Sequence, residues 1–345
     1  MLVSSYIHLR LTPRESATTY TVKLLFLNVY DINVKEIKMV RYLFYMGYIG
    51  TRYRGAAKQI GCERLIDVDS VQGAIEAALS TTLKPRSRCY PKVQISSRTD
   101  AGVHALFNTA QVDLEHPTDP FYDTETIIRR LNAWFSRCGH EIRITTIYPI
   151  TDDFDPRRNA KSRSYFYRLM VAKNFHEHKV PISELQRAWH IRGENIDIDA
   201  LRNATRLFMG TKNFETFAGK NRTNREIRYV RSLNSLTIDS AAPFMPFDPL
   251  SDRFHFWHIN ISARAFLYNQ VRKIVGALVG IASGIINERD ILTMLHVPSN
   301  LNWDPRIQMA PPQGLFLKNI EYDQEELANC ILKTQDAPRP RLFKL

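Results

Sequence analysis

Residues 96–105, Ser-Ser-Arg-Thr-Asp-Ala-Gly-Val-His-Ala, are the stretch around which this chain is organised. They lie between two short β-like runs at residues 93–95 and 109–114. This pattern predicts a turn between strands, with Gly102 supplying a positive φ. Arg98 stands two residues before Asp100, and a close positive charge lowers the pKa of an Asp and keeps it ionised. An ionised carboxylate can act as a nucleophile or base. An Asp that merely caps its own turn fits the same spacing.

The length and composition of the chain limit the class of protein to which it can belong. The 345 residues suffice for one large or two ordinary domains, and 44% hydrophobic with 24% charged residues is typical of soluble globular proteins. The net charge of +12, from 47 basic and 35 acidic residues, favours a polyanionic partner, above all nucleic acid. No apolar run reaches the 18 or so residues of a membrane span. The four cysteines are far apart in the sequence, which argues against a zinc site and indicates a reducing compartment.

The first half of the chain alternates strand and helix patterns. Residues 41–48 and 142–148 have the composition or alternation of strands. Residues 71–79 repeat apolar side chains at helical intervals, and so do residues 127–135. With the two strands around Asp100, the order is βαββαβ.

The second half repeats this order. Strands are predicted at residues 164–170, 226–238, 254–261 and 315–322, and helices from Asp199 to Gly210 and over residues 265–283. We therefore expect an α+β protein of two pseudo-duplicated βαββαβ halves, 39–155 and 156–322, with two antiparallel sheets flanking a basic cleft. Residues 1–38 are predicted to be a poorly ordered extension, and 323–345 a C-terminal tail.

Four segments carry a family resemblance. They are Arg98–Ala105 (Arg-Thr-Asp-Ala-Gly-Val-His-Ala), Arg163–Arg168 (Arg-Ser-Tyr-Phe-Tyr-Arg), Ala265–Arg272 (Ala-Phe-Leu-Tyr-Asn-Gln-Val-Arg) and Gly314–Leu317 (Gly-Leu-Phe-Leu). In this order, within a span of about residues 40–322, they resemble the TruA-type tRNA pseudouridine synthases, especially the animal pseudouridylate synthase-like branch. The resemblance implies a bipartite ferredoxin-like or RNA-recognition-like core, tRNA as partner, and chemistry without a cofactor or metal.

The same resemblance implies roles for particular residues. Asp100 corresponds to the catalytic nucleophile, and Tyr165 to an active-site tyrosine that stacks on the target uracil. Arg272 lies in an apolar helix pattern and needs an acidic partner, which the resemblance identifies as Asp100. Phe266 and Leu317 match positions that wall the uracil pocket. Core packing explains Phe266 and Leu317 equally well, and spacing alone favours it for Tyr165, because Tyr167 has the same parity in the strand.

Several cations are candidates for contact with RNA. Arg98 could replace the extruded base or hold a phosphate. A basic loop with few acids adds five candidates for the RNA backbone, and a glycine-rich loop near residue 50 adds two: Lys212, Lys220, Arg222, Arg225, Arg228, Arg52 and Arg54. The alternative for each of them is a solvated side chain.

The sequence thus predicts an isomerase that converts uridine to pseudouridine in tRNA, in the anticodon arm by resemblance. A catalytically silent RNA-binding relative is the alternative. A glycoside- or nucleoside-hydrolysing enzyme is a third hypothesis, although that chemistry usually needs a second catalytic carboxylate. The resemblance allows a homodimer and favours a mitochondrial location. The early Ser, Thr and Arg residues are mildly typical of a transit peptide. Translation from Met39, with a cytoplasmic or nuclear location, is the alternative.

Overall fold

The computed structural model describes residues 38–58, 67–83, 90–116, 122–193, 196–220 and 226–333. All of these residues belong to one compact unit. The extension predicted for residues 1–38 lies almost wholly outside the described residues, as does most of the predicted tail. The division into halves at residue 155 stays a prediction.

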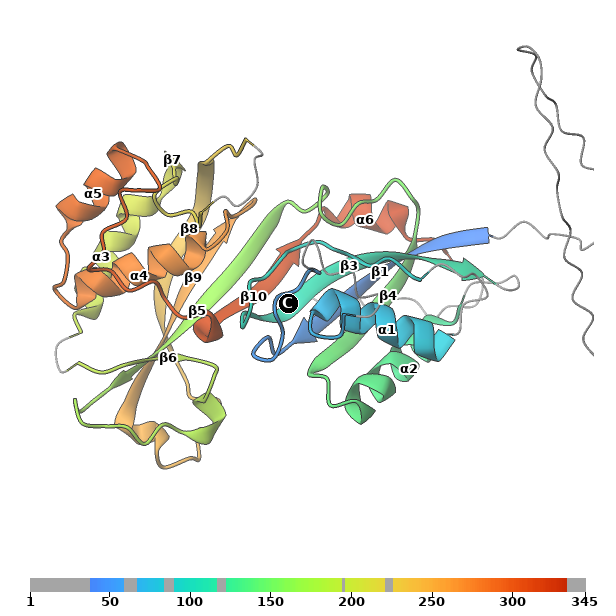
Figure 1. The fold of residues 1–345 in the computed structure, drawn as a ribbon, viewed down its shortest axis with the longest axis horizontal. Coiled ribbons are helices and arrows are strands. Elements are labelled where there is room, and N and C mark those ends of the chain that lie inside the picture. Colours follow the sequence, from blue (N-terminus) through green and yellow to red (C-terminus); the bar gives the residue numbers. More distant parts are fainter. Residues whose placement is uncertain are drawn as a thin grey trace, which may run out of the picture. The chain divides into compact units, whose positions relative to one another are not determined.

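The described strands form one ten-stranded, mostly antiparallel sheet (Figure 1). Its main path runs β4-β1-β3-β10-β5-β9-β8-β7, while β2 pairs with β3 and β6 with β5. The strands are β1 (Lys38–Tyr48), β2 (Gln94–Ile95), β3 (His104–His116), β4 (Ile142–Ile150), β5 (Ser162–Ala172), β6 (Trp189–Ile191), β7 (Gly210–Asn213), β8 (Val230–Ala241), β9 (Phe254–Ala263) and β10 (Leu315–Glu321). The α+β class and the predicted order of main strands are confirmed.

The expectation of two separate sheets is wrong. Strand β10 pairs in parallel with β3, where Leu317 lies opposite Ala105, and antiparallel with β5, where Leu317 lies opposite Tyr165. The strands of both predicted halves therefore share a single sheet, joined through β10. Whether the halves are duplicates of each other stays a prediction.

Six α-helices accompany the described part of the sheet: α1 (Val71–Leu83), α2 (Thr124–Arg137), α3 (Ile198–Ala204), α4 (Gln270–Ala282), α5 (Glu288–His296) and α6 (Gln324–Cys330). Figure 1 shows α1 and α2 beside the strands of the first half, and α3, α4 and α5 beside those of the second. The predicted apolar face of α1 is buried, from Val71 to Leu79. Burial of these side chains stabilises the helix on the sheet.

Helix α4 begins five residues later than the sequence pattern predicts. Asn269 has a left-handed backbone, with φ of 59° and ψ of 3°, and this conformation cannot continue a helix. Residues 265–269 therefore form a loop between β9 and α4. This difference matters for the site, because the loop carries Phe266 and ends three residues before Arg272.

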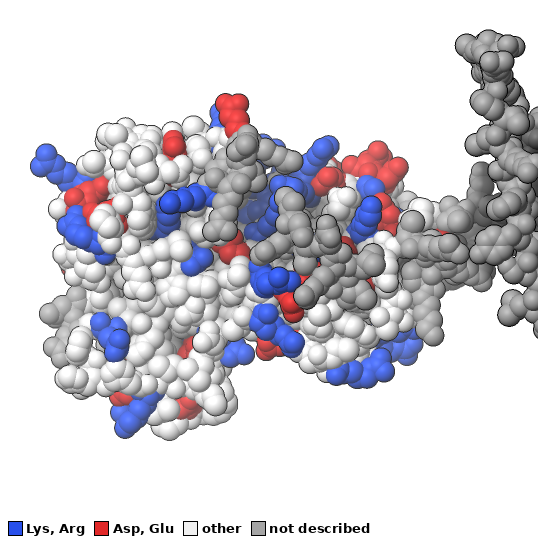
Figure 2. Space-filling view, in the orientation of Figure 1, with Lys and Arg blue, Asp and Glu red and all other residues white. Residues whose placement is uncertain are grey.

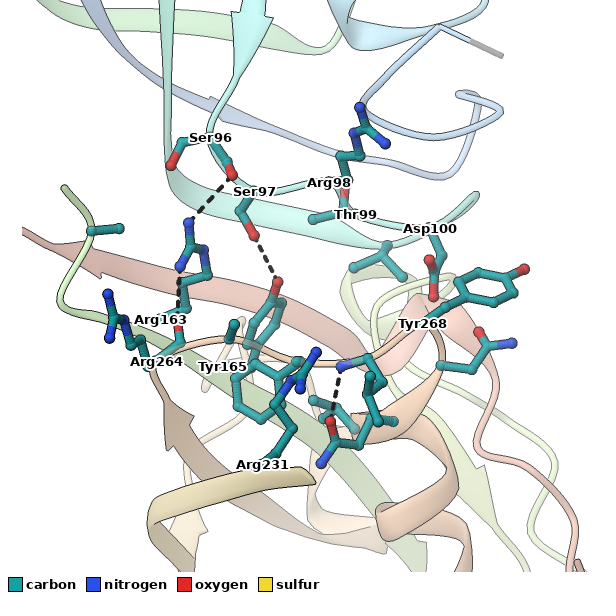
Figure 3. A pocket seen from close by; sticks show the side chains of 18 of the residues that line it. Ser96, Ser97, Arg98, Thr99, Asp100, Arg163, Tyr165, Arg231, Arg264 and Tyr268 are labelled. Atoms are coloured by element: carbon teal, nitrogen blue, oxygen red, sulfur yellow. Dashed lines mark hydrogen bonds between the residues drawn. The ribbon is translucent and has the colours of Figure 1, made fainter. Parts of the chain in front are cut away.

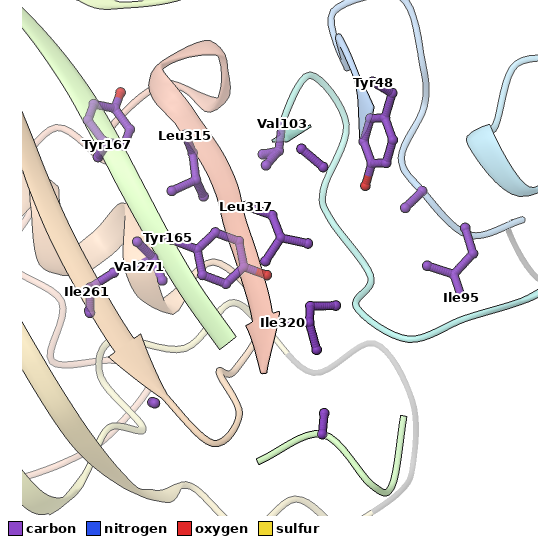
Figure 4. Close-up of a cluster of buried hydrophobic side chains, with 14 of the residues drawn as sticks. Tyr48, Ile95, Val103, Tyr165, Tyr167, Ile261, Val271, Leu315, Leu317 and Ile320 are labelled. Carbon is purple, nitrogen blue, oxygen red and sulfur yellow. The ribbon is translucent and has the colours of Figure 1, made fainter. Parts of the chain in front are cut away.

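The three adjacent strands β3, β10 and β5 join the two predicted halves, and we call this junction the seam. The apolar core continues from one half to the other across it. Figure 4 shows Tyr48, Val103 and Ile95 on one side, and Tyr165, Leu317 and Ile320 on the other. All six belong to the same buried apolar cluster. The seam is therefore a continuous part of the interior, which holds the segments around Asp100 and Tyr165 in a defined register.

Candidate active site

The Asp100 turn is held by backbone contacts. The Val103 amide donates to the Asp100 carbonyl at 3.1 Å, and Gly102 has φ of 79°, as the sequence predicts. The loop that follows β1 packs against this turn, with the Ala56 amide donating to the Thr99 carbonyl at 3.0 Å. A Cβ atom at Gly50 would lie 1.9 Å from the Val103 carbonyl oxygen. Glycine is therefore required there so that the two backbones can meet.

The turn opens into a cavity of about 970 Å³. Residues 96–100, 157–163, 228–234 and 264–272 supply most of its lining (Figure 3). Eight of the lining residues are arginines: Arg98, Arg157, Arg158, Arg163, Arg228, Arg231, Arg264 and Arg272. Figure 2 shows Lys and Arg side chains grouped around the middle of the visible face. Among the described residues that line the cavity, Asp100 is the only carboxylate.

Asp100 is paired with Arg272, as the resemblance implies. The distance from Arg272 Nη1 to Asp100 Oδ2 is 3.9 Å, and the two side chains are 12% and 22% exposed. Arg272 is fixed by two further hydrogen bonds, from Nε to the Ala310 carbonyl at 2.8 Å and from Nη1 to Asn269 Oδ1 at 3.0 Å. The guanidinium is therefore held beside the carboxylate without a bidentate contact that would occupy both carboxylate oxygens.

Burial dominates the titration of Asp100. It raises the pKa of Asp100 from 3.8 to about 6, and the Arg272 charge only partly opposes this effect. The expectation that Arg98 lowers this pKa is wrong. Arg98 is exposed, and within the described part of the chain it makes no hydrogen bond or ion pair. Asp100 is thus mostly ionised at neutral pH and becomes protonated in mild acid.

Tyr165 lies across the cavity from the Asp100 turn, on β5. Its side chain is 7% exposed, and its hydroxyl lies 3.0 Å from Ser97 Oγ. Its ring is perpendicular to that of Phe266, with centroids 5.3 Å apart. Burial raises the pKa of Tyr165, so the phenol is neutral. Both aromatic residues line the cavity.

Leu317, which the resemblance assigns to the wall of the uracil pocket, is not among the residues that line the cavity. It lies opposite Tyr165 in the β10–β5 register and is completely buried. In Figure 4 it is close to the Tyr165 ring. Leu315 of the same strand is the leucine of β10 that lines the cavity. Leu317 therefore supports Tyr165 from within the core.

Of the described cations predicted to contact the RNA backbone, only one lines the cavity. Arg228 lines the cavity, whereas Arg52, Arg54, Lys212 and Lys220 do not. Arg52 donates to the Gly139 carbonyl, and Arg54 forms ion pairs with Asp67 and Asp69 at 3.0 and 3.4 Å. Arg222 and Arg225 lie outside the described residues.

Five cavity arginines escaped the sequence analysis: Arg157, Arg158, Arg163, Arg231 and Arg264. Arg163 is the first residue of the family segment Arg163–Arg168, and Arg264 directly precedes the segment Ala265–Arg272, so their positions could have drawn attention to them. Arg163 is 8% exposed and donates to the carbonyls of Arg264 at 2.7 Å, Arg157 at 3.1 Å and Ser96 at 3.4 Å. It therefore ties together three segments of the cavity wall. No local signal distinguishes Arg157, Arg158 or Arg231 from solvated arginines.

The described ranges have neither a metal-binding cluster nor a membrane-spanning helix. They contain no group of three or more His, Cys, Asp or Glu side chains placed to hold a metal ion. They contain no helix with the length and apolar character needed to span a membrane.

Comparisons with known proteins identify the family. Residues 204–323 match the family model described as tRNA pseudouridine synthase. The chain is 33% identical over 292 residues to tRNA pseudouridine synthase-like 1 of Xenopus laevis, covering 83% of this chain and 93% of the relative. It is 32% identical to the Mus musculus protein of the same name, covering 82% and 94%. It is 29% identical to tRNA pseudouridine synthase A of Jannaschia sp., covering 84% and 98%.

These matches place the chain among enzymes of the isomerase class. It belongs to the tRNA pseudouridine synthase family, with relatives in both animals and bacteria.

Proposed function

We propose that this protein isomerises uridine to pseudouridine in tRNA, with Asp100 as the nucleophile. The observation that carries this proposal is the position of Asp100, which is paired with Arg272 and is the one carboxylate among the described residues that line the arginine-rich cavity shared with Tyr165. The relatives named tRNA pseudouridine synthases support tRNA as the substrate.

The reaction breaks the bond between ribose C1′ and uracil N1 and forms a bond between C1′ and C5. C5 loses its proton and N1 gains one, so the product is an isomer of the substrate. An ionised Asp100 can attack the nucleotide while the detached base turns. The carboxylate lies inside the cavity, and a base in a helical stem must therefore leave its stack to reach it.

The neighbouring side chains suit the other requirements of this reaction. Tyr165 and Phe266 offer aromatic surface to a uracil ring, and such stacking contributes about 1–3 kcal/mol. Arg272 keeps a positive charge beside Asp100, which favours the ionised form. The other arginines that line the cavity can hold phosphates, because the planar guanidinium matches the geometry of a phosphate group.

Two alternatives predict other outcomes. A silent RNA-binding relative would bind tRNA and leave every uridine unchanged. A glycoside hydrolase would usually need a second carboxylate, and none of the described lining residues supplies one beside Asp100.

The decisive experiment treats unmodified transcribed tRNA with the purified protein and maps pseudouridine at single-nucleotide resolution. We expect a new pseudouridine with the wild type and none with Asp100→Asn, although both bind tRNA. Tight binding by the wild type without any new pseudouridine would support the silent relative. Turnover by Asp100→Asn would overturn the assignment of the nucleophile.

We also propose that the target lies in the anticodon arm, that the substrate pool is mitochondrial, and that the protein is a homodimer. These points follow from the resemblance to the family. A tRNA whose anticodon-arm uridines are replaced by cytidine tests the first point. Mapping of separated organelle and cytosolic tRNA from cells with and without the protein tests the second. The mass in solution tests the third.

A further inference from the structure

Ser97 stands out among the cavity residues because its hydroxyl contacts Tyr165. The two hydroxyl oxygens are 3.0 Å apart, and Figure 3 shows this contact bridging the segment before Asp100 and strand β5. Ser97 is 5% exposed. Within the described part of the chain, each hydroxyl has the other as its sole hydrogen-bond partner. The orientation of the Tyr165 hydroxyl therefore depends on one serine.

Asn108 of β3 in turn fixes the backbone of Ser97. Asn108 Nδ2 donates to the Ser97 carbonyl at 2.8 Å and to the Tyr48 hydroxyl at 3.0 Å. The Tyr48 hydroxyl in turn lies 2.8 Å from Thr99 Oγ1. Asn108 is completely buried, and buried networks whose groups are paired are rigid. This network holds the residues on both sides of Arg98, immediately before Asp100.

The contact has a chemical consequence for the cavity. Each of the two hydroxyls carries one hydrogen, and their mutual bond uses only one of the two. Because Ser97 and Tyr165 both line the cavity, the second hydrogen can be donated to a bound molecule. A base carbonyl or a ribose oxygen is the matching acceptor. The pair therefore leaves one hydroxyl hydrogen free for donation next to the aromatic ring.

We propose that Ser97 is a positioning residue for the uridine reaction, which sets the orientation of the Tyr165 ring and hydroxyl against the target nucleotide. This inference rests on the proposed function. Ser97 acts through Tyr165, so its effect must disappear when the Tyr165 hydroxyl is absent.

The test is a double-mutant cycle of Ser97→Ala and Tyr165→Phe, measured as kcat and KM for tRNA. Thr109→Val is the matched control, because Thr109 is also buried and its hydroxyl also contacts a tyrosine hydroxyl, that of Tyr322 at 2.5 Å. Thr109 does not line the cavity. The thermal midpoint of each variant shows whether it folds as the wild type does.

Loss of one hydrogen bond of ordinary strength changes a rate by about 3- to 10-fold. We expect Ser97→Ala to lower kcat by this factor while KM stays within about twofold of the wild type. Thr109→Val should keep the wild-type kcat. In the Tyr165→Phe background, Ser97→Ala should cause no further loss. A full additional loss in that background, an equal loss of kcat in Thr109→Val, or an unchanged kcat in Ser97→Ala would each overturn the proposal.

A second measurement needs no turnover. The NMR signal of the Tyr165 ζ-carbon, assigned with Tyr165→Phe, should move in Ser97→Ala and stay in place in Thr109→Val. If the wild type makes no pseudouridine, the proposed function fails, and this signal still tests the contact. A signal that is unchanged in Ser97→Ala would overturn the positioning role.

Discussion

Arg272 Nη1 lies 3.9 Å from Asp100 Oδ2, yet the pKa of Asp100 is raised to about 6. Desolvation of the carboxylate outweighs the attraction of the guanidinium, because the contact is single and not bidentate. Asp100 is therefore ionised at neutral pH at the expense of protein stability. This balance leads to the first two predictions.

Asp100→Asn should abolish pseudouridine formation and at the same time stabilise the fold at neutral pH. The folded pKa is about 6 and the unfolded value 3.8, so the wild type loses stability as pH rises through this window. Asparagine does not titrate. The stability advantage of the variant should therefore grow by about 2 kcal/mol between pH 4.5 and pH 7.5. Denaturant unfolding at both pH values measures it, and an advantage that is equal at both would contradict the raised pKa.

The fall of the reaction rate on the acid side of its pH profile, which we call the acid limb, should reflect the protonation of Asp100. Single-turnover rates of the wild type are expected to fall below about pH 6 as Asp100 becomes protonated. Arg272→Gln removes the charge that lowers this pKa, so the limb should shift to higher pH. Arg272→Lys keeps the charge and serves as the control. A limb that stays in place in Arg272→Gln would mean that another group controls it.

Tyr165 can be tested by separating its ring from its hydroxyl. Tyr165→Phe keeps the stacking surface, whereas Tyr165→Leu loses it. If stacking dominates, the Leu variant should be about 10- to 100-fold less active than the Phe variant. Thermal midpoints serve to identify any loss that comes from unfolding, since Tyr165 is buried. Equal loss in both variants would make the hydroxyl the essential group, and no loss in either would leave Tyr165 a packing residue.

The RNA path can be traced by salt dependence. Replacing Arg157 and Arg158 together by Ala should weaken tRNA binding and flatten the log–log salt slope by about 1–2, since each phosphate contact contributes about 0.7–0.9. Arg202→Ala with Arg206→Ala is the control, because these exposed arginines pair with Asp199 and Glu288 and lie outside the cavity. Affinity at several salt concentrations is the measurement.

Arg222→Ala with Arg225→Ala examines the basic loop in the same assay. A flattened slope in this variant, with an unchanged slope in the Arg157 and Arg158 variant, would mean that tRNA follows the loop and does not cross the cavity rim. Flattening in both variants would mean that both surfaces contact the RNA.

Local sequence patterns predicted the turn at Asp100, the positive φ of Gly102 and the order of the main strands, because these features depend on neighbouring residues. The resemblance supplied the pairing of Arg272 with Asp100. The single sheet could not be foreseen, since it depends on β10 meeting β3 over a separation of about two hundred residues.

The properties of individual site residues were harder to predict. The raised pKa of Asp100 follows from burial that only the folded chain creates. The late start of α4 follows from the left-handed Asn269 within an apolar, helix-like pattern. Arg157 and Arg158 line the cavity because of where their loop lies, and a loop arginine has no distinctive sequence context.

The central place of β10 has a consequence for biosynthesis. In the described sheet, β3 and β5 do not pair with each other and are joined only through β10, although its residues are made well after those of both other strands. The ribosome thus completes both walls of the cavity before it supplies the strand that aligns them. A nascent or truncated chain that ends before residue 315 should expose two unpaired strand edges, which tend to aggregate. Catalytic competence therefore requires that translation has passed residue 321, so activity distinguishes chains that contain β10 from those that stop short of it.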